Sequence, residues 1–318
     1  MQFRTQIPVP KSNSPIDYTS GIVSLGSCFA ENIGAKFEYF KFRASVNPFG
    51  IIFNPVSLEK LICRSIQKEY FTEKDIFWYN DFWHSFEVHS ELSSSDKELF
   101  LKSLNEIIDE FYKRLTESSH VCITLGTSWV YRNVKSDEIV ANCHKVPQKQ
   151  FTKELLSVIQ IEESLRRIIA SVTSINPNCH FIFTVSPVRH SKDGFVENQR
   201  SKAHLITALQ KILLTEHYLP NTVYFPSYEI MMDELRDYRF YAEDMLHPNS
   251  IAIDYIWERF FQTMISETCY PVMEEVNYIQ KALQHRPFNP DSESHRKFSQ
   301  KLHQKIAALK VKMPHISF

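Results

Sequence analysis

The segment Gly21-Ile-Val-Ser-Leu-Gly-Ser27-Cys28-Phe-Ala30 constrains the fold of this 318-residue chain more than any other. Its apolar start predicts a β-strand that ends at Gly26, and an amphipathic helix is expected to begin at once, with Phe29, Ile33, Phe37 and Phe40 at helical spacing. A strand that turns directly into a helix holds a side chain at the carboxyl edge of an α/β sheet, where such folds bind ligands. Ser27 is therefore a candidate nucleophile, although a Gly-Ser pair at a strand end is often only a turn.

Strand-like and helix-like stretches alternate along most of the chain, which favours a parallel sheet covered on both faces. The fold class expected is therefore α/β. A box Ser95-Asp-Lys-Glu98 is typical of a helix start. The strands are expected at 22–25, 44–46, 121–125, 181–185 and 223–225, and the helices at 29–40, 96–115, 152–174, 200–217 and 249–266.

Two stretches lie outside this alternation. Residues 70–90 are rich in aromatic side chains and predict a β-hairpin packed on the domain edge, or alternatively a flap over the site. Residues 270–318 contain Pro271, Pro287 and Pro290, followed by an expected basic helix at 295–311. Its apolar stripe either docks on the protein's own domain, which we favour, or contacts a membrane or anionic partner. We expect a domain at 1–268 and a helical extension at 269–318 packed on it.

Charge and composition exclude several classes of partner. The chain has 36 Lys and Arg against 37 Asp and Glu, so its net charge of −1 gives no reason to expect nucleic acid binding. No apolar run approaches the length of a membrane span, and the first ten residues lack the apolar core of a secretory signal. The six cysteines contain no Cys-x-x-Cys pair, which favours reduced thiols. We expect a cytoplasmic protein without stable membrane insertion, and its oligomeric state stays open.

A serine nucleophile needs a base and a group that orients the base. In the pattern Asp-x-x-His, a helical turn brings the carboxylate to the Nδ1–H group of the imidazole and leaves Nε2 to take a proton. The pattern occurs at Asp81–His84 and at Asp244–His247. The second pair follows the last expected strand and is predicted to lie at the same sheet edge as Ser27. His84 lies in the aromatic stretch, where a structural role is the better interpretation.

Residues 26–30, Gly-Ser-Cys-Phe-Ala, spell the signature of the GSCFA family, which is similar to the SGNH (GDSL-like) hydrolase superfamily. The resemblance covers roughly residues 20–260. Other segments that resemble the family are Asn47-Pro48-Phe49-Gly50, Thr124-Leu125-Gly126-Thr127, Asn142-Cys143-His144-Lys145, Ser186-Pro187-Val188-Arg189-His190 and Glu243-Asp244-Met245-Leu246-His247-Pro248.

This resemblance implies a flavodoxin-like α/β/α sandwich with a five-stranded parallel sheet. It implies Ser27 as nucleophile, His247 as general base and Asp244 as its partner, with the backbone N–H groups of Ser27 and Gly50 in the oxyanion hole. The wider superfamily has Gly-x-Asn in its third block, whereas this chain has Gly126-Thr127-Ser128. One oxyanion donor contributes about 2.7–4 kcal/mol to catalysis, so Thr127 or Ser128 would have to replace the amide, or the substrate differs.

Several further residues are candidates to line the cleft: Asn142, His144, Arg189, His190 and His84. Arg189 suits an anionic group on the substrate, or alternatively pairs with Asp193. The pair Cys143–His144 lacks the further ligands of a zinc site, so neither metal nor cofactor is expected. Cys28 lies at a helix start that stabilises thiolates, but we expect it to turn into the domain while Ser27 faces the cleft.

The sequence thus predicts a serine hydrolase or acyltransferase that acts on an ester of a small polar molecule. A ligand-binding protein without turnover is one alternative, favoured by the missing third-block Asn. Thiol catalysis at Cys28 is another.

Overall fold

A computed structural model describes residues 5–215, 221–289 and 292–318. Its centre is a five-stranded parallel sheet in the order β2-β1-β5-β9-β10. The strands are β1 (Gly21–Gly26), β2 (Arg43–Val46), β5 (His120–Leu125), β9 (His180–Val185) and β10 (Thr222–Tyr224), which confirms all five predicted strands within a residue or two. β2 and β5 lie on opposite sides of β1, so the order in which strands are added to the sheet reverses at β1. Ligands of such folds bind at the carboxyl ends of the strands next to this reversal.

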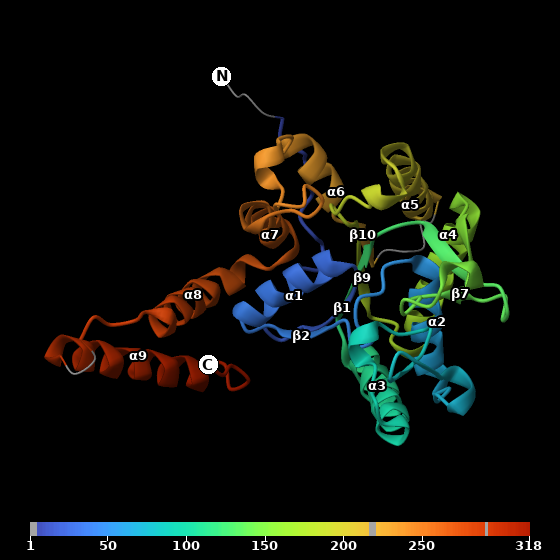
Figure 1. Cartoon of the computed structure of the whole chain (residues 1–318). Coiled ribbons are helices and arrows are strands. Elements are labelled where there is room, and N and C mark those ends of the chain that lie inside the picture. Colours follow the sequence, from blue (N-terminus) through green and yellow to red (C-terminus); the bar gives the residue numbers. More distant parts are fainter. Residues whose placement is uncertain (1–4, 216–220, 290–291) are drawn as a thin grey trace.

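Alternating side chains of the strands divide the core into two apolar layers, because successive residues of a strand point to opposite faces. Val23, Val121 and Phe181 pack with α2 (Pro55–Gln67), α3 (Lys97–Glu117), α4 (Val158–Ile175) and α5 (Phe195–Thr215). Ile22, Cys122 and Ile182 pack on the other face, with α1 (Cys28–Tyr39) and α7 (Ser250–Met264). Helices therefore cover both faces in a three-layer α/β/α arrangement (Figure 1).

The prediction of one helix over 152–174 is wrong at its start. Residues 151–155 form β8 (Phe151–Leu155), which pairs with β6 (Trp129–Asn133) beside β7 (Ile139–Val140) in a small antiparallel sheet. Helix α4 begins only after Ser157, whose hydroxyl accepts the Gln160 N–H group in a capping box. The helix α2 was not predicted, and α3 is capped by Asp96 rather than Ser95.

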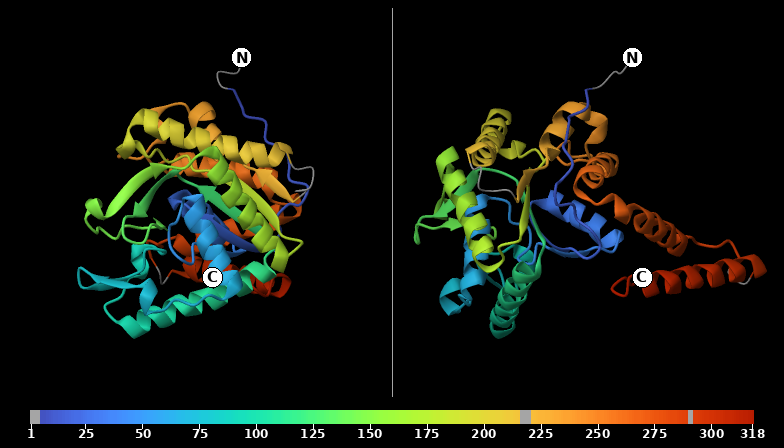
Figure 2. Two further views of the ribbon diagram at one scale, coloured as in Figure 1. Left: turned by 90° about the vertical axis from the view of Figure 1, so that its right-hand side faces the viewer. Right: turned by 180° about the vertical axis from the view of Figure 1, so that it is seen from behind.

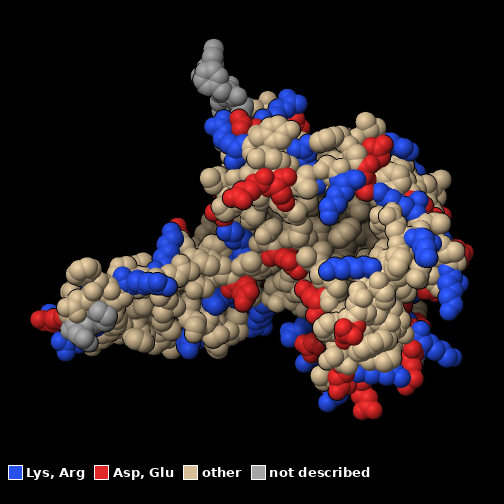
Figure 3. Space-filling view, in the orientation of Figure 1, with Lys and Arg blue, Asp and Glu red and all other residues tan. Residues whose placement is uncertain are grey.

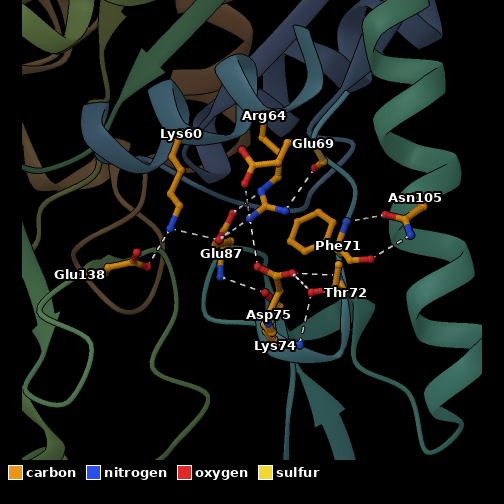
Figure 4. Close-up of polar contacts among 11 residues, drawn as sticks. Lys60, Arg64, Glu69, Phe71, Thr72, Lys74, Asp75, Glu87, Asn105 and Glu138 are labelled. Carbon is orange, nitrogen blue, oxygen red and sulfur yellow. Dashed lines mark hydrogen bonds and ion pairs between the residues drawn. The ribbon is translucent and has the colours of Figure 1, made fainter. Parts of the chain in front are cut away.

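The aromatic stretch forms the predicted hairpin, β3 (Phe77–Tyr79) and β4 (Phe82–His84). Arg64 of α2 fixes the preceding loop, as Figure 4 shows. Its guanidinium lies 3.1 Å from Asp75 and 3.0 Å from Glu87, covers the Phe71 ring and is only 5% exposed. A buried ion pair thus attaches the loop that leads into the hairpin to the body of the protein.

The C-terminal residues form α8 (Tyr270–Gln284) and α9 (Glu293–Lys312), so Pro271 lies in the first turn of a helix that was not predicted. The two helices project from the body beside α1 and β2 (Figures 1 and 2). Leu302, Leu309 and Ile316 are buried in the same apolar layer as α1 and α7. Helix α9 contacts α8, and the packing of the extension on the domain stays a prediction. The basic side chains of α9 are exposed: Arg296, Lys297, Lys301, Lys305, Lys310 and Lys312.

The strand β2 is at one edge of the sheet, and the C-terminal residues lie beside it. His315 and Ser317 line a cavity of about 660 Å³ together with residues 43 and 44 of β2. Acidic and basic side chains are interspersed over the face in Figure 3, in keeping with the near-zero net charge. Among the described residues, no helix has the length and hydropathy needed to cross a membrane.

We predict that Arg64→Met lowers the free energy of unfolding by about 1.5–3 kcal/mol, because it removes a buried guanidinium that pairs with the carboxylates of Asp75 and Glu87, while Lys60 still pairs with Glu87. The matched control is Arg167→Met, which removes a half-exposed guanidinium from its ion pair with Glu59 and should cost less than about 1 kcal/mol. Urea denaturation measures both values. Equal losses in the two variants would contradict the role of Arg64.

Candidate functional site

The turn between β1 and α1 is set by a close backbone contact. Gly26 has a φ of +134°, and a Cβ atom there would lie 2.1 Å from the carbonyl oxygen of Thr124 in β5. The Gly26 N–H group donates to the Asn47 side chain at 2.8 Å, and the Ser27 N–H group donates to the Thr124 carbonyl at 3.1 Å. Only glycine fits this position, which delivers Ser27 to the end of the sheet.

Ser27 is the N-cap of α1 and is 1% exposed. Its Oγ accepts the Phe29 N–H group at 3.2 Å. In this bond the hydroxyl acts as acceptor, so its own proton stays available for transfer. A hydrogen bond donated to Oγ also favours the charged form of the hydroxyl over the neutral one. The N-terminus of α1 adds a partial positive charge at the same place.

Asp244 and His247 form the predicted pair in the loop before α7. The Asp244 Oδ2 atom lies 2.6 Å from His247 Nδ1, and Oδ1 accepts the backbone N–H groups of Leu246 and His247. Hydrogen bonds from the backbone N–H of His247, then from that of Leu246, lower the pKa of Asp244 to about 2. An ionised carboxylate at Nδ1 keeps the proton on that nitrogen and leaves Nε2 as an acceptor.

Ser27 and His247 line one cavity of about 540 Å³ at the carboxyl end of the sheet. Residues some 220 positions apart in the chain thus share a site, and Asp244, which does not line the cavity, is hydrogen-bonded to His247. In the part of the chain that the structure describes, no hydrogen bond joins Ser27 Oγ directly to the His247 ring. The main lining residues from other segments are Phe53, Asn54, His89, Thr127, Trp129, Tyr131, Val140, Asn142, Cys143, Arg189 and His190.

The predicted oxyanion donors have other partners in this structure. The Ser27 N–H group is bonded to Thr124, and the Gly50 N–H group donates to the Asn47 carbonyl at 2.7 Å. Gly50, with a φ of +76°, lines a smaller apolar cavity instead. By contrast, over the described residues the backbone N–H groups of Cys28 and Thr127 donate to no backbone carbonyl, and both residues line the large cavity.

The hydroxyls of the third block are held from α5. Thr127 Oγ1 lies 2.8 Å from Ser201 Oγ and accepts the Trp129 N–H group. Ser128 is fully buried, its hydroxyl donates to the Ser201 carbonyl, and it does not line the cavity. These bonds fix the loop after β5 but engage both hydroxyls that were expected to replace the missing Asn.

Cys28 lines the cavity as well, so the expectation that it turns into the domain is wrong. Burial raises the pKa of its thiol, which disfavours the thiolate despite the helix N-terminus. Ser27 and Cys28 therefore both line the cavity, but the raised pKa of the thiol makes Cys28 the weaker candidate nucleophile.

Of the remaining predicted residues, Asn142, Arg189 and His190 line the cavity. His84 and His144 do not: their rings lie 4.6 Å apart, among Phe77 and Phe86. His84 bonds to Ser93 and to the Tyr79 carbonyl, and His144 donates to the Ser85 carbonyl at 2.6 Å. Burial lowers the pKa of His144 to about 4, so that ring is neutral near pH 7, and the hydrogen bonds of both histidines indicate a structural role.

Arg189 is surrounded by the rings of Phe195, Tyr238 and Tyr241, each 5.4–5.7 Å from its guanidinium carbon. The alternative pairing with Asp193 is not found, since the Asp193 carboxylate pairs with Lys153. Over the described residues, no carboxylate lies within ion-pair distance of Arg189. A cation that lines a cavity without a carboxylate partner is suited to bind an anionic group.

Sequence reasoning missed one wall of the cavity and a buried cation. This wall comes from the small antiparallel sheet and contains Trp129 and Tyr131 of β6 and Val140 of β7. The sheet was missed because its strand β8 was predicted as the start of the helix over 152–174. Lys202 of α5 is 1% exposed. Its spacing from Leu205 and Leu209 places it on the apolar face of that helix, a signal that was present in the sequence.

The fold and the cavity define an α/β protein with a candidate Ser-His-Asp site at the carboxyl edge of a parallel sheet. A family model, described as the GSCFA family, matches residues 21–260, and the chain belongs to this family. A second model, the C-terminal domain of GSCFA domain proteins, matches residues 276–318, which contain most of α8 and all of α9. A search of curated proteins finds no match to the chain.

We predict that Gly26→Ala destabilises the fold more than Gly194→Ala does. Both glycines have positive φ, at +134° and +111°, which alone costs an alanine about 1–2 kcal/mol. At Gly194 the new methyl group meets the movable end of Glu197, whereas at Gly26 it meets the backbone of β5. Thermal or urea denaturation measures the difference, and equal values would show that the turn tolerates a side chain.

Proposed function

We propose that this protein is a serine hydrolase or acyltransferase of the SGNH (GDSL-like) type, acting on an ester of a small polar molecule. The observation that carries the proposal is the shared cavity: Ser27 and His247 both line it, and Asp244 lies 2.6 Å from the far nitrogen of His247. A serine, a histidine and an aspartate that lie together at a ligand-sized cavity are the combination that activates a hydroxyl for nucleophilic attack.

In the proposed reaction, Ser27 Oγ attacks the ester carbonyl carbon and His247 Nε2 takes the hydroxyl proton. Asp244 holds the ring through Nδ1–H and stabilises the imidazolium, which then gives its proton to the leaving alcohol. Water, or another hydroxyl, resolves the acyl-serine by the same proton transfers in reverse. With a pKa of about 2, Asp244 stays ionised throughout the neutral range and adds no step to the pH profile there.

The carbonyl oxygen becomes negative in the tetrahedral intermediate and needs donors. The backbone N–H groups of Cys28 and Thr127 are the ones we infer, since those of Ser27 and Gly50 are engaged with Thr124 and Asn47. Use of the latter pair would require those bonds to break as substrate enters.

Two other functions remain as candidates. The engaged N–H groups and the absence of a Ser27–His247 hydrogen bond among the described residues favour a ligand-binding protein without turnover. The exposure of Cys28 to the cavity keeps thiol catalysis open, although its raised pKa counts against it. Inactivation by iodoacetamide but not by a fluorophosphonate would favour Cys28 over Ser27.

We expect Ser27→Ala to abolish labelling by a fluorophosphonate probe and hydrolysis of short-chain p-nitrophenyl esters, because the attacking oxygen is gone. The matched control is Ser24→Ala, a buried serine of the preceding strand β1 that does not line the cavity, which should be labelled like the wild type. Circular dichroism checks the folding of both. Equal labelling of Ser27→Ala and wild type would reject the nucleophile, and an unlabelled, inactive wild type would favour the binding function.

We expect Arg189→Gln to raise KM for an ester whose acyl or alcohol part carries a carboxylate, by about tenfold or more, and to leave KM for a neutral ester of equal size within about twofold. The guanidinium lines the cavity and has no carboxylate partner among the described residues, and a hydrogen bond to a charged partner is worth about 1.5–3 kcal/mol. Steady-state kinetics with the two esters measure the difference. The same change of KM for both substrates would mean that Arg189 does not select charge.

A further inference from the structure

Lys202 is a buried cation for which the proposed reaction has no role so far. It lies on the sheet-facing side of α5 with Leu205 and Leu209, and only 1% of its surface is exposed. An unpaired buried ammonium would cost the fold several kcal/mol, and replacing such groups by apolar side chains is often neutral or stabilising. Stability alone therefore does not explain a lysine at this position.

The contacts of Lys202 join the two loops that border the cavity. Its Nζ donates to the Gly126 carbonyl at 2.7 Å and to the Ser186 carbonyl at 2.8 Å. Gly126 and Ser186 are the residues that directly follow β5 and β9. The Tyr228 ring lies 5.6 Å from the same nitrogen. Two carbonyl oxygens and an aromatic face are partners that suit an ammonium ion.

The charge of Lys202 also acts on side chains that line the cavity. It is close enough to Cys28 to lower the pKa of the thiol, against the larger effect of burial. Burial, and to a smaller extent Lys202, lower the pKa of His190 to about 3, so that ring is neutral in the site. Burial lowers the pKa of Lys202 itself to about 7, and the charge of Cys28 acts in the opposite direction, so the ammonium group carries its charge most fully below that pH.

The loop held by Lys202 is the one that departs from the superfamily pattern. The segment Gly126-Thr127-Ser128 has no amide side chain, and Ser201 engages both of its hydroxyls. Adjacent residues of α5, Ser201 and Lys202, thus fix this loop, and Lys202 is the charged one of the two. A positive charge in a low-dielectric surrounding acts over a longer range than a neutral amide does.

We propose that Lys202 is a positioning residue of the Ser27 site, which holds the loops after β5 and β9 at the cavity and supplies the positive charge that favours the oxyanion in place of the missing third-block Asn. The inference rests on the proposed function. According to this inference, the charge of Lys202 on α5 compensates for the amide side chain that the loop after β5 lacks.

The test compares wild type, Lys202→Met and Lys202→Gln. Methionine keeps an unbranched chain and removes both charge and donors, while glutamine keeps two N–H donors without the charge. We expect both variants to lower kcat for a neutral p-nitrophenyl ester and the rate of fluorophosphonate labelling by about 10- to 100-fold, with KM within about twofold. Rates are divided by the final amount of label, so that a lower folded fraction does not imitate the effect.

Arg64→Met is the control for loss of a buried cation elsewhere: it should lower stability and leave the normalised kcat unchanged. A normalised kcat of Lys202→Met, or of Lys202→Gln if the methionine variant does not fold, within twofold of wild type would overturn the inference. A rise of KM at constant kcat would overturn it too, because that result indicates ground-state binding. If wild type takes no label at Ser27, the proposed function itself fails, which is a distinct outcome.

Discussion

The site depends on how closely β1 and β5 approach each other at their carboxyl ends. At Gly26 the backbone of β1 lies against the Thr124 carbonyl, which leaves no room for a side chain and bonds to the Ser27 N–H group. The strand therefore turns at once into α1, and Ser27 caps that helix at the floor of the cavity. The loop after β5 begins two residues beyond the same contact. The turn, the cap and the neighbouring loop share one geometric constraint.

Two buried cations illustrate different uses of charge in this fold. Arg64 is surrounded by carboxylates and attaches the loop of the aromatic hairpin to α2. Lys202 instead donates to backbone carbonyls of the loops after β5 and β9, which reach the cavity. An ion pair neutralises its own field, whereas a cation bonded to neutral carbonyls keeps a net charge that acts on its surroundings. The position of each cation thus fits a different role, one in folding and one beside the site.

The sequence predicted the central sheet because each parallel strand is a short apolar run followed by polar or glycine residues, as in Val121–Leu125 and Phe181–Val185. It also predicted the pair Asp244–His247, whose contact is local. The sequence did not predict the cavity wall formed by β6 to β8. Leu155, Leu156 and Ile159 continue an apolar pattern into α4 and so extended the predicted helix, although Ser157 and Gln160 mark its true start. Pro271 was interpreted as a break, while the structure uses it in the first turn of α8.

Which hydrogen bonds the oxyanion donors make could not be read from the sequence, because backbone partners such as Thr124 and Asn47 are set by tertiary packing. The same holds for Lys202, since a helical stripe identifies a buried position but not the carbonyls that meet it.

The strand β2 at the sheet margin has a further consequence. An unpaired strand can recruit a strand from another molecule and so start aggregation. Here Arg43 is exposed on that strand, and His315 and Ser317 stand beside it while Ile316 anchors their segment in the apolar layer. Residues 315–317 therefore lie where a strand from another molecule would have to approach β2, so they restrict access to that edge of the sheet.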